Sequence, residues 1–148
     1  MGRISVWDTS KDVSKKGNNV GKVNIYFDGG VHGKRVCIYD QSNNKYLVKT
    51  ITDAKTNNEL EYWALIMSLR YARRIYKEGD VIFNGDSSLV INQVWGSWRI
   101  NKERLRILMI IVNKELDKCK FNVSARWTRR NKNFAGIHLE KLMKSDKK

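Results

Sequence analysis

Three short runs in which apolar and polar residues alternate follow one another after the first twenty residues: VNIYFDGG (23–30), KRVCIYD (34–40) and KYLVKTIT (45–52). Alternation of this kind predicts strands with one buried face. The intervening segments GGVHGK and QSNNK carry the glycine and asparagine residues that tight turns use. The three runs therefore predict an antiparallel meander.

Helical and strand patterns alternate after this meander. Strong helix formers at helical spacing predict a helix from Asn57 to about Tyr76, and an apolar run between glycines predicts a strand over 79–86. Two helices (87–95 and 101–118), a strand (120–128) and a closing helix (133–148) complete the predicted order. A helical crossover from the meander to the fourth strand adds a parallel neighbour. The predicted fold class is α/β, a five-stranded mixed sheet with helices on both faces, antiparallel in its first three strands and parallel in the last two.

The length of 148 residues suits one domain with a sizeable core. Residues 1–21 are polar and basic, which predicts an extension or linker before a domain over 22–148 that ends in a basic tail. No apolar run approaches the roughly 18 residues of a membrane span, and the first residues lack the apolar core of a signal peptide. Cys37 and Cys119 lack metal-ligand spacing and are expected to be buried thiols in a reducing compartment. We expect a cytoplasmic monomer that does not bind membranes.

Positive charge is large and unevenly distributed. The net charge is +14, and residues 99–148 contain 15 Lys and Arg against 5 Asp and Glu, a net of +10. Such asymmetry favours a polyanionic partner, in particular a nucleic acid, and a solvated lysine-rich surface is the alternative. Trp95, Trp98 and Trp127 lie among these basic residues, where they could pack in the core or stack near a sugar–phosphate backbone.

Three carboxylates fall at corresponding places in the predicted fold. Asp28 ends the first strand, Asp86 ends the fourth, and Glu61 lies early in the first long helix on the same face as Leu65. Sites in open α/β sheets gather at the carboxyl ends of strands, and an inward carboxylate needs a partner. Each acid has an ordinary explanation, as a turn residue, a helix cap or a surface acid such as we expect Glu59 to be. Their joint placement favours a common site.

A divalent metal ion is the partner that these carboxylates would suit. Hard oxygen ligands bind Mg²⁺ or Mn²⁺, and two such ions about 3.5–4 Å apart activate water and stabilise the leaving oxygen of a phosphodiester. In a basic chain, the Lys and Arg side chains would bind a polyanion, whereas the carboxylates would bind the metal ion. The residues therefore predict a metal-dependent nuclease with Asp28, Glu61 and Asp86 as ligands.

The segments IYFDGG, TNNELEYWALIMSL and NGDSSLVINQVWG resemble, in order and spacing, the three leading motifs of the type 1 ribonuclease H family. The resemblance extends over roughly residues 23–142, and the family's interval after Thr-Asn-Asn selects Glu61 rather than Glu59 as the catalytic glutamate. It implies a ribonuclease H-like fold and an endoribonuclease that hydrolyses the RNA strand of RNA–DNA hybrids. It further implies two Mg²⁺ ions, with Mn²⁺ as a substitute, and products with 5′-phosphate and 3′-hydroxyl ends. No obligatory protein partner is expected.

The resemblance also implies substrate contacts. Gly29, Gly30 and Asn58 are similar to family positions that contact the RNA backbone and its 2′-hydroxyls, the group that separates RNA from DNA. The segment VWGSWRINKERLR resembles the basic, tryptophan-containing segment that grips the DNA strand in many members. The predicted substrate-binding residues are Gly29, Gly30, Asn57, Asn58, Ser88, Trp95, Trp98, Arg99, Lys102 and Arg130.

The family's fourth carboxylate, near the start of the last helix, has no obvious counterpart. No acid lies between Trp127 and His138, and Glu140 is expected to lie too far along the helix. We predict that Asn133 fills the fourth catalytic position, with Asn131 and His138 as alternatives; capping the last helix is the ordinary explanation for Asn133. Because three carboxylates compensate less charge than four, the second ion is expected to bind weakly, and Mn²⁺ is expected to support better activity.

Other interpretations remain open. One is a weakly active or inactive module on the same fold that binds hybrids or double-stranded RNA. Another is a different enzyme of the broad fold, such as a junction resolvase or a reverse-transcriptase tail domain. The Thr-Asn-Asn-x-x-Glu spacing and the three acids favour the ribonuclease. The short RRNKN loop resembles the archaeal type, which places Arg130 at the scissile phosphate and leaves His32 and His138 without an assigned role.

Overall fold

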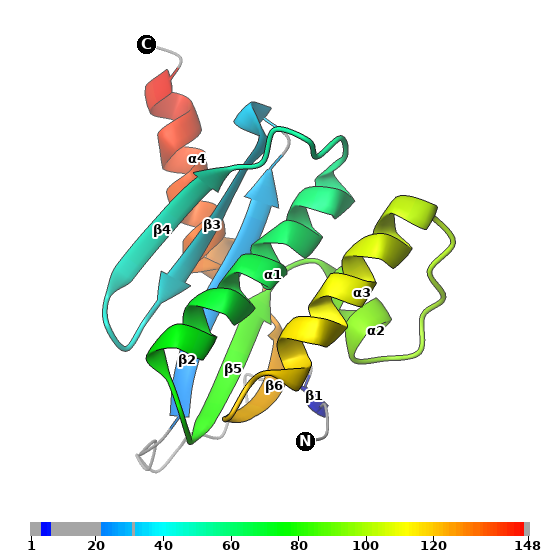
Figure 1. Cartoon of the computed structure of the whole chain (residues 1–148). Helices are drawn as coiled ribbons and strands as arrows, with labels where there is room; N and C mark the ends of the chain where they lie inside the picture. The colour runs from blue at the N-terminus through cyan, green and yellow to red at the C-terminus, as the bar shows by residue number, and fades with distance from the viewer. Residues whose placement is uncertain (1–3, 7–21, 31, 147–148) are drawn as a thin grey trace.

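The computed structural model describes residues 4–6, 22–30 and 32–146, and these form a six-stranded sheet flanked by helices (Figure 1). The strands are β1 (Ile4–Val6), β2 (Lys22–Gly30), β3 (Arg35–Asp40), β4 (Lys45–Thr50), β5 (Asp80–Gly85) and β6 (Asn122–Trp127). The α-helices are α1 (Asn57–Ile75), α2 (Ser88–Val94), α3 (Glu103–Asp117) and α4 (Phe134–Asp146). Two short 3₁₀ turns are η2 (His32–Lys34) and η3 (Arg130–Lys132).

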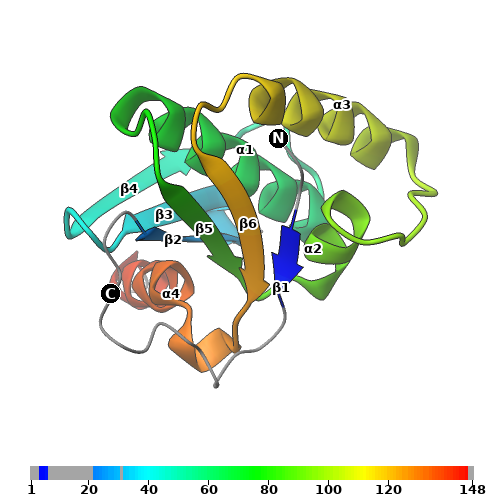
Figure 2. The same ribbon diagram turned by 90° about the horizontal axis from the view of Figure 1, so that it is seen from below.

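The predicted five-stranded mixed sheet is confirmed. Strands β2, β3 and β4 pair antiparallel, whereas β5 lies parallel to both β2 and β6. Helices α1, α2 and α3 cover one face of the sheet and α4 covers the other (Figure 2). Strand β1, which falls within the predicted N-terminal extension, adds a sixth strand parallel to β6. The rest of that extension lies outside the described residues.

Parallel pairing of β2 with β5 brings two of the predicted acids together. Tyr26 is the register partner of Asn84, so Asp28 and Asp86 each follow two residues later at the same edge of the sheet. The local sequence determines the residue at which each strand ends. The parallel register makes these two ends neighbours, as expected for sites at the carboxyl edge of an α/β sheet.

Helix α1 begins at a cap that also joins it to α3. The Thr56 hydroxyl accepts a hydrogen bond from the Glu59 backbone N–H at 3.2 Å, and the Glu59 carboxylate accepts one from the Lys55 N–H at 2.9 Å. The guanidinium of Arg104 in α3 binds the same carboxylate at 2.9 and 3.0 Å, and this pairing holds the pKa of Glu59 below its ordinary value. The expectation that Glu59 is a surface acid is therefore wrong, because it is a buried ion-pair partner.

The main core lies between the sheet and helices α1 to α3, and one glycine sets how closely α1 approaches. A Cβ atom added to Gly29 would lie 2.4 Å from the backbone oxygen of Leu60. Only glycine therefore permits β2 and the start of α1 to pack this tightly. The close approach carries Glu61, the residue after Leu60, toward Asp28. The apolar side chains that fill this core without exposure include Ile25, Phe27, Leu65, Leu69, Phe83 and Val112.

Two hydrogen bonds of the buried Gln93 side chain fix α2 and the basic segment after it. The Tyr62 hydroxyl donates to Gln93 Oε1 at 2.6 Å, and Gln93 Nε2 donates to the Arg99 carbonyl at 3.0 Å. Trp95 packs against the core, whereas Trp98 is 50% exposed. Of the two roles that the sequence left open for these tryptophans, packing applies to Trp95.

Helix α4 packs on the opposite face, where Cys37, Ala135 and Leu139 form a small second cluster. Cys37 and Cys119 are both buried and free, as predicted. Within the described part of the chain, no helix combines the length and apolar character that crossing a membrane requires.

Candidate metal centre

The three predicted ligands converge where β2, β5 and α1 meet. Carboxylate oxygens of Asp28, Glu61 and Asp86 all lie within 4.8 Å of one another. Asp28 Oδ1 and Glu61 Oε1 are buried and have no hydrogen-bond partner. Buried carboxylate oxygens without donors are costly, and a hard divalent cation is the ligand that an all-oxygen set of this kind fits. The residues present therefore fit a metal ion.

Burial is the main cause that raises the pKa of all three acids. Burial, followed by repulsion from Asp86, raises the pKa of Asp28 to about 7. Burial and the neighbouring charges of Asp28 and Asp86 raise the pKa of Glu61 well above its ordinary value. The pKa of Asp86 is also raised by burial, although Asn133 and Arg130 oppose this effect. In the absence of a cation, protons are the alternative means of neutralising the cluster.

The metal-free protein is expected to lose stability as the pH rises. Asp28 binds its proton more tightly in the folded state than in the unfolded chain, where its ordinary value is 3.8. The contribution of Asp28 to stability is therefore largest below that value and falls until the pH passes about 7. Thermal unfolding in EDTA between pH 5 and 8 should show this decline, and it should be smaller in Asp28→Asn. A melting temperature that is flat or rising for the unmodified protein would contradict the expectation.

The acids lie in an open pocket of about 430 Å³. Of the predicted substrate-binding residues, those that line it are Gly29, Gly30, Asn57, Asn58 and Arg130. A Cβ atom added to Gly30 would meet nothing within 4 Å, so there is open space beside the backbone at this position. Arg130 lines the pocket, and its positive charge opposes the rise in the pKa values of Asp28 and Asp86.

Other predicted contacts lie outside this pocket. Ser87 lines it in place of Ser88, and the Ser87 hydroxyl caps α2 by accepting from the Val90 N–H at 3.2 Å. The residues Trp95, Trp98, Arg99 and Lys102 lie at the end of α2 and in the connection to α3 and are not part of the lining. Contact with both regions at once would require a ligand longer than this pocket.

Asn133 is close to the acids, but its amide is oriented to support them. Its Nδ2 donates to the Phe27 carbonyl at 3.0 Å and to Asp86 Oδ2 at 3.4 Å. Its Oδ1 accepts from the Ala135 N–H at 3.2 Å, as a capping oxygen does. This geometry differs from the one expected of Asn133 as a substitute for the fourth carboxylate, because its oxygen is already used by the helix. The side chain instead positions Asp86.

The position of α4 that faces the acids is Gly136. A Cβ atom added there would lie 3.1 Å from Asp28 Oδ2. Glu140, one turn later, lines the same pocket, but among the described residues it is not one of the acids whose oxygens lie within 4.8 Å of one another. The alternatives lie elsewhere: Asn131 lines a different pocket, and the ring of His138 stacks on a tyrosine of β4. The helical spacing of Gly136, Glu140 and Met143, all lining residues, is a signal that the sequence already contained.

The chain is similar to known proteins over most of its length. The model of the reverse transcriptase-like family matches residues 27–139. Ribonuclease H1 from the halophilic archaeon Halobacterium salinarum has a TM-score of 0.65 at 28% identity, over 80% of this chain and 94% of that one. The N-terminal ribonuclease H domain of a Mycobacterium tuberculosis protein, solved as a fusion with maltose-binding protein, has a TM-score of 0.64 at 25% identity, over 80% and 95%.

A third solved structure adds a likeness in fold. LC11 ribonuclease H1, isolated from compost by a metagenomic approach, was solved in complex with an RNA/DNA hybrid. Its TM-score is 0.64 at 24% identity, over 75% of this chain and 88% of that one. Among proteins with curated descriptions, none matches this sequence.

Proposed function

This chain belongs to the reverse transcriptase-like family, of the type 1 ribonuclease H kind, and from that premise we propose that it is an endoribonuclease that hydrolyses the RNA strand of RNA–DNA hybrids. The observation that carries the proposal is the meeting of Asp28, Glu61 and Asp86 within 4.8 Å in a chain with a net charge of +14. The carboxylates at the carboxyl edge of the sheet would bind a divalent cation, and the positively charged surface would attract a polyanion.

The residues of the centre have distinct roles in this proposal. Asp28, Glu61 and Asp86 would hold two divalent ions, Mg²⁺ or, as a substitute, Mn²⁺. When bound, such ions activate water and stabilise charge on the phosphodiester oxygens, which gives 5′-phosphate and 3′-hydroxyl ends. Asn133 donates to Asp86 Oδ2 and so limits the rotation of that carboxylate. Arg130, exposed at the rim, would bind the phosphate beside the cleavage point.

Recognition of RNA is proposed at the start of α1. Asn57 and Asn58 line the pocket beside the acids, and asparagine amides can both donate to and accept from a 2′-hydroxyl. The open space at Gly30 lets a strand approach the backbone. The exposed residues Trp98 and Lys102 lie outside the pocket and would contact the DNA strand.

A comparison of duplexes tests the proposal. Labelled RNA–DNA hybrid, duplex RNA and duplex DNA would be incubated with the protein in Mg²⁺ or Mn²⁺, and the product ends would be identified. We expect cutting of the hybrid alone, in its RNA strand. Tight hybrid binding without cutting would instead favour a recognition module, and preferential cutting of DNA junctions would favour a resolvase.

A further inference from the structure

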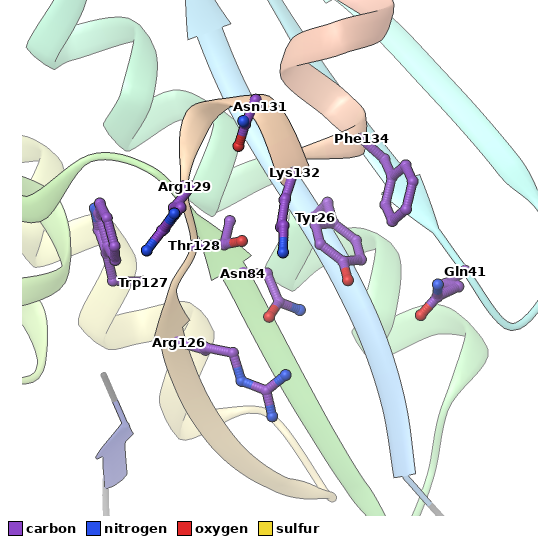
Figure 3. A pocket seen from close by; sticks show the side chains of 10 residues that line it. All are labelled: Tyr26, Gln41, Asn84, Arg126, Trp127, Thr128, Arg129, Asn131, Lys132 and Phe134. Carbon is purple, nitrogen blue, oxygen red and sulfur yellow. The ribbon is translucent and has the colours of Figure 1, made fainter. Parts of the chain in front are cut away.

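A second pocket lies on the α4 side of the sheet, and none of its described lining residues also lines the acidic pocket (Figure 3). Its volume of about 570 Å³ falls within the range of about 300–1,000 Å³ that small-molecule sites occupy. The turn η3 separates the two pockets: Arg130 contributes to the acidic one, whereas Asn131 and Lys132 contribute to the second.

The wall of this second pocket is positively charged. Arg126, Arg129 and Lys132 line it, and none of the described residues in its lining is acidic. In the view of Figure 3, Lys132 extends toward Asn84 from one side and Arg126 lies on the other side of Asn84. Guanidinium and ammonium groups are the usual protein ligands of phosphate. The pocket therefore favours an anion, and phosphate in particular.

A buried asparagine gives the pocket a directional group. Asn84 is 1% exposed, and the two N–H groups of its Nδ2 are shared among three acceptors, Asn24 Oδ1, the Ile25 carbonyl and the Ile82 carbonyl, each at 3.2 Å. These bonds fix the amide, whose Oδ1 is buried and has no hydrogen-bond partner. A buried acceptor of this kind requires a donor. The dianion of a phosphate monoester has no hydrogen to provide, whereas a nucleobase amino group or a ribose hydroxyl can.

Aromatic rings complete the lining. The ring of Phe134 packs edge to face on Tyr26, with ring centroids 4.9 Å apart, and Phe134 keeps 38% of its surface exposed. Trp127 lines the pocket on the side opposite Phe134 (Figure 3). Aromatic faces beside phosphate-binding cations are a common arrangement for stacking a nucleobase.

We propose that this pocket binds a phosphorylated nucleoside. Arg126 and Lys132 bind the phosphate, Asn84 Oδ1 accepts a hydrogen bond from the base or the ribose, and the base contacts Phe134. The ligand is a free mononucleotide or an unpaired nucleotide of a single strand, since both present the same chemistry. A base-paired nucleotide does not fit, because its base is held inside the duplex. The proposal is independent of the hydrolytic activity proposed above.

Titration of ¹⁵N-labelled protein at pH 8 with AMP, and separately with methyl phosphate as the phosphate control, tests the pocket by NMR. EDTA would be present so that no metal bridges the nucleotide to the acidic centre. We expect AMP to shift the Asn84 side-chain amide and the backbone amides of 126–132 in a saturable way, and methyl phosphate to leave the Asn84 amide largely unshifted. Absence of a saturable shift with AMP would overturn the proposal, as would equal shifts with methyl phosphate alone.

A matched pair of lysine variants distinguishes the two sources of the nucleotide. Lys132→Met removes a proposed phosphate contact, and Lys120→Met removes an exposed lysine outside both pockets. In the Asp28→Asn background without divalent ions, affinity for a labelled single strand should fall at least about fivefold in Lys132→Met only. The slope of log affinity against log salt should then decrease in magnitude by about 0.7, the value for one phosphate contact with a single strand.

The remaining outcomes are also decisive. If Lys132→Met weakens AMP binding but not binding of the single strand, the free mononucleotide is the ligand and the proposal stands. If it weakens a blunt hybrid as strongly as a single strand, the pocket is part of a general polyanion surface and the proposal fails. Because cleavage is absent from the measurement, failure here would leave the ribonuclease proposal untouched.

Discussion

Asp28→Asn is expected to reduce hybrid cleavage by at least about 10³-fold, or about 4 kcal/mol of transition-state stabilisation. The substitution keeps the size of the side chain but removes one charge from a set of three carboxylates within 4.8 Å. The same change should raise the melting temperature of the metal-free protein at pH 8, because burial and Asp86 disfavour the charged form of Asp28. Initial cleavage rates in Mg²⁺ and thermal unfolding in EDTA measure the two effects.

The matched control is Asp117→Asn, which makes the same substitution at the exposed end of α3. It should leave both cleavage and the metal-free melting temperature nearly unchanged. Loss of activity in Asp28→Asn together with a lowered melting temperature in EDTA would contradict the repulsion argument. Retained activity would remove Asp28 from the catalytic set.

Gly136→Asp is expected to tighten the binding of Mn²⁺ at least about tenfold, because affinity for hard cations rises with the number of charged ligands. A Cβ atom at this position points to the centre, 3.1 Å from Asp28 Oδ2, so Asp28 must move by a few tenths of an ångström to accept it. The added charge should lower metal-free stability, and bound ion should restore it. Calorimetric titration without substrate measures the affinity directly.

Gly136→Asn provides the control, since it has the same shape without the charge. If both variants tighten Mn²⁺ binding equally, the charge argument fails.

Asn133→Asp, which the sequence alone would have chosen, should instead destabilise the fold. It loses the donations from Nδ2 to Phe27 and Asp86 and places a second negative charge beside the Asp86 carboxylate.

The order of strands and helices could be predicted because periodicity and turn residues are local properties. The alternation in 23–30 and the helical spacing after Asn57 indicate elements whose type does not depend on distant residues. The metal centre could be predicted for a related reason. Asp28 and Asp86 end parallel strands, and the ends of such strands meet at one edge of the sheet.

Only the tertiary structure determined which side chains of one element face those of another, because this depends on how each helix is rotated against the sheet. Glu59 was expected at the surface, but α3 places Arg104 over it. Spacing alone could not show how Asn133 is oriented, because the packing of the last helix on the sheet directs its Nδ2 to Asp86 and brings Gly136 next to Asp28. The second pocket also combines residues of β2, β5 and β6 with the segment around η3. Sequence patterns fix the faces of single elements, whereas side-chain packing across the sheet fixes which of these faces meet.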